Sequence, residues 1–81
     1  QSYPNPFQVR THIPWTLEKA ADVQIRVYDL LGREVALLVN SFVEAGSHQV
    51  VFERGNLVAG MYLVQMTAGS TRKVQKVIIS N

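Results

Sequence analysis

Short segments in which apolar and polar residues alternate run through most of this chain. The first covers residues 9–17 (VRTHIPWTL), and similar alternation follows at 23–28, 48–53, 61–67 and 73–79. Turn-forming residues separate these segments at intervals of about 8–12 residues. A period of two is that of a half-buried β-strand, and no stretch has the longer apolar period of an amphipathic helix. The chain is therefore predicted to be all-β.

Two positions and one run refine the expected strands. Pro14 has no N–H to donate to a neighbouring strand, so its segment is expected at a sheet edge or at a bulge. Val35 to Val39 is a continuous apolar run, which we expect to be buried on both faces. Before that run, Gly32 in the sequence DLLGR can take the positive φ that a hairpin turn requires.

A tyrosine near the start of the penultimate segment indicates how the strands connect. Leu57, Gly60 and Tyr62, in LVAGMY, resemble a tyrosine corner, in which the hydroxyl bonds to upstream backbone beside a Greek-key connection. A ligand contact is the alternative role for Tyr62, but a buried tyrosine normally uses its hydroxyl for structure. The predicted fold class is an all-β, immunoglobulin-like antiparallel β-sandwich of about seven short strands, Greek-key, with a tyrosine corner.

Length and composition limit the class of protein further. The 81 residues suffice for one domain, and 47% hydrophobic against 17% charged residues excludes a disordered tail. The chain has no cysteine, hence neither a disulfide nor a thiolate metal site. Its apolar runs are shorter than the roughly 20 residues of a membrane-spanning helix, and no secretory signal pattern opens it. Because it begins with Gln1, we expect it to be part of a longer protein.

Patterns that carry catalysis or metal binding are missing from the sequence. No serine lies in a G-x-S-x-G elbow, and neither a calcium loop nor a glycine-rich phosphate loop is present. His12 and His48 are the two histidines, and a position on a strand surface is favoured over metal ligation for both. The sequence predicts no catalytic, cofactor-binding or metal-binding residue, and hence no enzyme.

Charge is distributed unevenly along the chain. Residues 1–53 carry a net charge of −2, whereas residues 54–81 carry +4 and no acid. Such asymmetry can mark a contact surface for an anionic partner, or simply a solvated edge strand protected from aggregation, which we favour. Four cations are too few for a nucleic-acid interface, so no nucleic-acid partner is predicted.

Aromatic residues bear on a possible carbohydrate site. A sugar-binding platform needs several exposed, coplanar rings. Trp15 shares the apolar side of its segment with Ile13 and Leu17, so we expect it in the core. Tyr28 falls among the polar positions of its segment and is the better candidate for exposure.

The order of the motifs is more specific than any one of them. The chain opens with YPNPF, in which two X-Pro bonds favour extended backbone, and continues with THIPWTL, VQIRVYDLLGREV, AGSHQVVF, LVAGMYLV and a lysine-bearing last segment. This series resembles the type A C-terminal sorting domain of the type IX secretion system, over essentially all 81 residues.

The resemblance implies a secretion address rather than an activity. Such a domain directs its cargo from the periplasm through the outer-membrane type IX translocon to the cell surface or the extracellular space. A surface sortase-like cysteine peptidase would remove the domain or use it in cell attachment. Residues 1–81 would form a single sorting domain, with residues 1–8 as an extended segment joining it to an upstream cargo domain. The alternative is an immunoglobulin-like spacer, or a carbohydrate-binding accessory module of a multidomain extracellular enzyme.

The resemblance also suggests roles for individual residues. Because a C-terminal read-out needs exposed groups near the end of the chain, five residues are expected to serve recognition: Arg72, Lys73, Lys76, Ser80 and Asn81. The other matched positions are expected to be structural: Tyr3, Pro4, Asn5, Pro6, Phe7, Tyr28, Asp29, Gly32, Gly46, Leu57, Gly60 and Tyr62.

Overall fold

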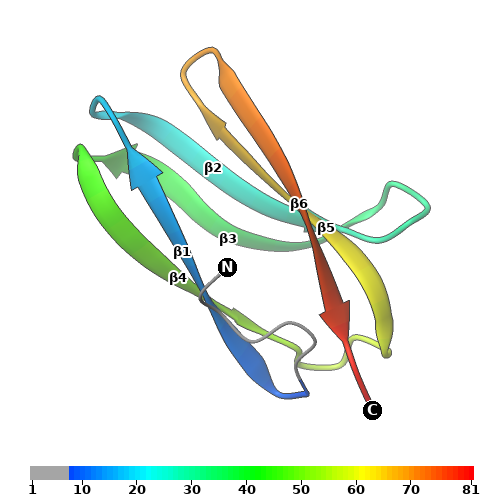
Figure 1. Cartoon of the computed structure of the whole chain (residues 1–81). Helices are drawn as coiled ribbons and strands as arrows, with labels where there is room; N and C mark the ends of the chain where they lie inside the picture. Colours follow the sequence, from blue (N-terminus) through cyan, green and yellow to red (C-terminus); the bar gives the residue numbers. More distant parts are fainter. Residues whose placement is uncertain (1–7) are drawn as a thin grey trace.

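The computed structural model describes residues 8–81, so the YPNPF motif (Tyr3, Pro4, Asn5, Pro6 and Phe7) lies outside the described residues. Residues 8–81 form six strands and no helix (Figure 1). The strands are β1 (Arg10–Leu17), β2 (Ala21–Tyr28), β3 (Glu34–Val43), β4 (Gly46–Glu53), β5 (Gly60–Ala68) and β6 (Thr71–Ile79).

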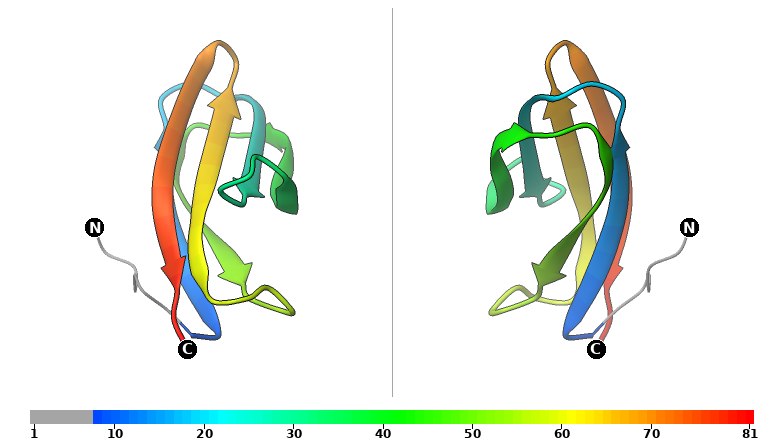
Figure 2. Two further views of the ribbon diagram at one scale, coloured as in Figure 1. Left: turned by 90° about the vertical axis from the view of Figure 1, so that its right-hand side faces the viewer. Right: turned by 90° about the vertical axis from the view of Figure 1, so that its left-hand side faces the viewer.

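The strands form two antiparallel sheets that pack face to face. One sheet pairs β1 with β4, and the other has the order β3-β2-β5-β6 (Figure 2). Because β1 pairs with β4 while β2 and β3 lie in the opposite sheet, the chain crosses between the sheets as a Greek-key sandwich does. The predicted all-β sandwich is confirmed. The expected count of about seven strands is wrong for the described residues, which pair β1 and β4 as a sheet of two.

Alternating side chains supply the core between the sheets. On β2, Val23, Ile25 and Val27 are buried while the intervening residues are not. The same alternation holds on β5 and at the C-terminal end of β6. Phe52 of β4 and Val77 of β6 are fully buried, and Thr11 of β1 is buried beside them. The period of two therefore assigned the core-facing side of these strands correctly.

The apolar run on β3 is not buried on both faces. No residue of Val35–Val39 is fully buried, and Leu37 is 46% exposed. The register against β2 shifts twice, which leaves Leu38 and Val35 without a Cα partner. Each such bulge turns successive side chains toward the same face of an edge strand. The residues of this run that pack against the core are Val35, Ala36, Leu38 and Val39.

Pro14 lies where its missing donor is tolerated. It pairs with Gln49 in an unbroken register, and β1 has β4 as its one strand partner in the described chain. The expectation of an edge strand is confirmed, and no bulge occurs there. Trp15, which was expected in the core, is only half-buried, and Tyr28 is half-buried as well.

Candidate functional site

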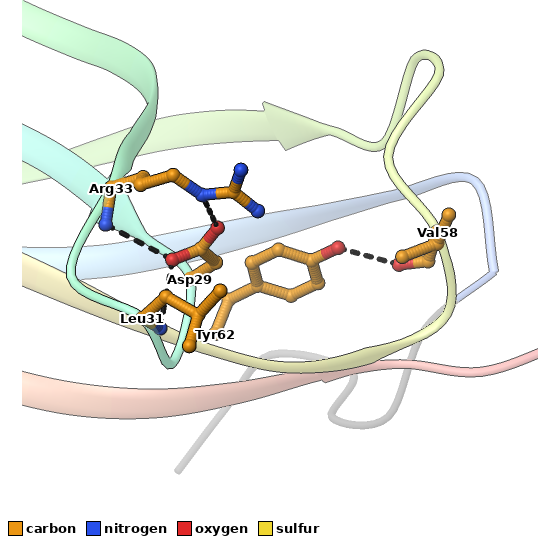
Figure 3. A network of polar contacts seen from close by, with 5 residues as sticks. All are labelled: Asp29, Leu31, Arg33, Val58 and Tyr62. Carbon is orange, nitrogen blue, oxygen red and sulfur yellow. Dashed lines mark hydrogen bonds and ion pairs between the residues drawn. The ribbon is translucent and has the colours of Figure 1, made fainter.

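The hairpin between β2 and β3 is organised by one carboxylate. Oδ1 of Asp29 accepts hydrogen bonds from the backbone N–H groups of Leu31 (2.9 Å) and Arg33 (3.0 Å), and Oδ2 accepts one from Arg33 Nε (2.8 Å; Figure 3). The bond from the Arg33 N–H lowers the pKa of Asp29 below its ordinary value, and the Arg33 side chain and the Leu31 N–H act in the same direction. Gly32 completes the turn with φ +86°.

The tyrosine corner lies beside this hairpin. Tyr62 Oη donates a hydrogen bond of 2.6 Å to the carbonyl oxygen of Val58, while the ring is only 4% exposed (Figure 3). Leu57, just upstream, packs against the core. The arrangement satisfies the one polar atom of an otherwise apolar buried ring.

Most of the residues that match the family motifs gather at this end of the sandwich. Asp29, Leu57, Gly60 and Tyr62 line one hollow of about 460 Å³. Its rim carries apolar side chains that are largely exposed, among them Leu31 (80%) and Val58 (74%). Two matched residues lie elsewhere: Gly46 pairs with Leu17 at the other end of β1, and Tyr28 lies on the outer face of the large sheet, opposite Leu63.

The cations expected to serve recognition are divided between the two faces of β6. Arg72 and Lys76 pair with Thr67 and Leu63, whose side chains lie on the outer face of the large sheet. Lys73 has the parity of the buried Val77 and turns toward the space between the sheets. The three cations therefore do not form one charged surface.

The last two residues are held by contacts with distant parts of the chain. Arg54 Nη1 donates to the carbonyl oxygen of Ser80 (3.1 Å), and Gln8 Nε2 donates to that of Asn81 (2.6 Å). Arg54 Nε also donates to Leu57 O (2.8 Å). The structure thus places Ser80 and Asn81 beside the start of the described chain. Sequence reasoning counted Arg54 only as a charge; its position after an alternating segment gave no sign of these bonds.

A polar cleft opens between β1 and the first half of β6. It has a volume of about 400 Å³ and is lined by Pro14, Trp15, Thr16, Ser47, His48, Lys73 and Gln75. Trp15 stacks on His48 with their ring centroids 4.7 Å apart, which sequence reasoning did not foresee. Trp15 Nε1 is buried without a hydrogen-bond partner among residues 8–81. No carboxylate lines the cleft, so hydrogen-bond donors predominate in it.

The stacked pair also bears on sugar binding. His48 covers part of the Trp15 ring, and the ring is half-buried, so the exposed coplanar aromatics of a carbohydrate platform are not assembled at this residue. Within residues 8–81, no three His, Asp or Glu side chains gather where they could hold a metal ion. No helix in that part of the chain is long and apolar enough to cross a membrane.

Comparison with known proteins gives one match. The model of a family described as the secretion system C-terminal sorting domain matches residues 1–80. No curated protein and no solved structure matches the chain.

Proposed function

The chain belongs to the family of secretion system C-terminal sorting domains, and on this basis we propose that it carries an upstream cargo domain through the outer-membrane type IX translocon to the cell surface. The observation that carries the proposal is the extent of the family match. It spans residues 1–80, and therefore all six strands rather than one motif. A type IX sorting signal acts with the secretion machinery and a cargo, and cargo of this pathway reaches the cell surface or the extracellular space.

In the proposed sequence of events, the domain folds in the periplasm and the translocon then reads it. A surface sortase-like cysteine peptidase then removes the domain or attaches the cargo to the cell. The domain is a substrate in these steps and supplies no catalytic group. Residues 1–8 form the proposed connection to the cargo. The hydrogen bond between Gln8 and Asn81 supports this arrangement, because it puts that connection beside the last residue.

The proposed recognition surface comprises Arg72, Lys73, Lys76, Ser80 and Asn81. All three cations are exposed, which a group read by another protein must be. Ser80 and Asn81 have ordered backbone carbonyl groups, held by Arg54 and Gln8. An ordered terminus would lose less conformational entropy on binding than a free one.

A localisation assay tests the proposal. Residues 1–81 are fused behind a signal peptide and a folded fluorescent reporter, and expressed in a bacterium with a type IX translocon and in a translocon-deficient strain. The proposal predicts that the reporter reaches the outside of the first strain and stays in the periplasm of the second. Periplasmic retention in both strains, with a protease-resistant tail, would favour an immunoglobulin-like spacer instead.

The recognition residues need variants that leave the fold intact. Deleting residues 72–81 would remove β6 and with it the fully buried Val77, so failed export would then report unfolding. Arg72→Gln and Lys76→Gln alter only outward-facing side chains and are the better test. Arg10→Gln, on the exposed face of β1, is a control with the same loss of charge. Export that falls with the first two variants but not with the control supports recognition through β6.

A further inference from the structure

The cleft beside Lys73 lies between two sheet edges. β1 and β6 are outermost in their respective sheets among the described residues, and both views of Figure 2 place them on one side of the sandwich. Alternate residues of an edge strand direct N–H and C=O groups away from the neighbouring strand. An extended peptide is the ligand that can use such groups, by strand addition.

The lining of the cleft favours a negatively charged ligand. Lys73 makes no ion pair within residues 8–81, although Glu18 shares an adjoining hollow with it. The buried Trp15 Nε1 faces no acceptor, and Ser47 and Thr16 contribute hydroxyl groups. A carboxylate would supply both the missing charge and the missing acceptors.

We propose that this cleft docks an extended acidic peptide segment of a partner protein, with one carboxylate on Lys73 Nζ. That the partner belongs to the export machinery rests on the function proposed above; the docking itself does not. A second copy of the chain is the weaker candidate, because pairing β6 with its own copy would bring Arg72, Lys73 and Lys76 close to the same cations. A peptide that alternates acidic and apolar residues matches both the charge and the strand edge.

The position of the single tryptophan provides a local measurement. A short synthetic peptide alternating valine and glutamate is titrated into the 81-residue chain while Trp15 emission is followed. We expect a saturable change that weakens as salt rises, because salt screens a partly exposed ion pair. The same peptide with glutamine in place of glutamate should produce no saturable change. Equal responses to the two peptides would overturn the proposal.

Two neighbouring cations serve as test and matched control. Lys73→Gln should weaken binding of the acidic peptide about tenfold or more, the effect of losing one charge-assisted hydrogen bond. Arg72→Gln removes the same charge one residue away, but on the opposite face, and should leave the affinity within about twofold. If both variants weaken binding equally, attraction to the overall charge explains it and the cleft is not the site.

Two further measurements decide between occupants. Removal of residues 1–7 that raises the peptide affinity more than tenfold would show that the chain's own segment occupies the cleft, which overturns the assignment to a partner. A concentration-dependent dimer that Lys73→Glu dissociates would overturn it in favour of a second copy. The localisation assay stays separate, because a tail that is not exported can still bind the peptide. Export that survives Lys73→Glu while peptide binding is lost would remove the export machinery as the partner.

Discussion

Tyr62 Oη lies 2.6 Å from the carbonyl oxygen of Val58, four residues upstream, and this bond joins β5 to the connection that precedes it. The same ring is almost fully buried, so its hydroxyl exchanges water for a single backbone acceptor. The contact therefore fixes the path by which the chain returns from the small sheet to the large one.

Removing this hydroxyl should destabilise the domain without disturbing its packing. Tyr62→Phe is expected to lower the free energy of unfolding by about 1–2 kcal/mol, because it leaves the Val58 carbonyl without its partner. Denaturant titration measures the change. Tyr28→Phe is the matched control, since the Tyr28 hydroxyl has no hydrogen bond within residues 8–81. Equal midpoints for the two variants would contradict the tyrosine corner.

The hairpin turn should be sensitive to a side chain at Gly32. Its φ of +86° is one that L-residues rarely adopt, and no atom within 4 Å would contact an added Cβ. Gly32→Ala should therefore lower the free energy of unfolding by about 1–2 kcal/mol through backbone strain alone. Gly32→Asn should lower it less, because asparagine tolerates positive φ better. Thermal unfolding measures both, and an unchanged midpoint for Gly32→Ala would show that the turn relaxes.

The Asp29 carboxylate should make stability depend on acidity. Because folding lowers its pKa below the ordinary 3.8, the charged form stabilises the fold above that pH, and the contribution disappears as the pH falls through the lowered value. Asp29→Asn should be less stable than the wild type at neutral pH, and the gap should narrow below pH 3.8. Urea midpoints across pH test this. Asp22→Asn, at an exposed carboxylate with no hydrogen bond in the described chain, should retain the wild-type pH course. A gap that stays constant into strong acid would refute the role of Asp29.

Arg54 should control the order of the last residues. Arg54→Lys keeps the charge but cannot make both of the side-chain bonds to Leu57 O and Ser80 O. We expect a loss of about 1 kcal/mol in the free energy of unfolding and faster amide hydrogen exchange near the C-terminal end of β6. Arg72→Lys, which breaks no bond, should change neither. Unaltered exchange in Arg54→Lys would mean that other contacts hold the terminus.

Local periodicity predicted what depends on one strand at a time. The alternation of Val23, Ile25 and Val27 assigned the buried side of β2, and Pro14 indicated an edge strand. It could not predict the bulges on β3, because a register shift depends on how two strands pair. The apolar run from Val35 to Val39 looked like two-faced burial for that reason. The seventh strand came from the fold class rather than from a segment of its own.

At the candidate site, residue types were easier to predict than their arrangement. The sequence grouped Arg72, Lys73 and Lys76 by proximity, although a period of two already separates Lys73 from the other two. Glu34 lies across the hairpin near Arg26, and that ion pair of 2.7 Å could have been expected from the turn. The contacts of Arg54 with Ser80 and of Trp15 with His48 could not, because each joins segments brought together only by the complete sandwich.

The meeting of Gln8 and Asn81 at one end of the molecule has a mechanical consequence. A load applied between these two residues pulls β1 and β6 away from their partners beginning at their ends. The ladder bonds then break in succession rather than all at once, so the domain offers little resistance to such a pull. A machine that grips the end of this chain while cargo trails from its beginning would peel the sandwich open with far less force than shearing it along its strands would take.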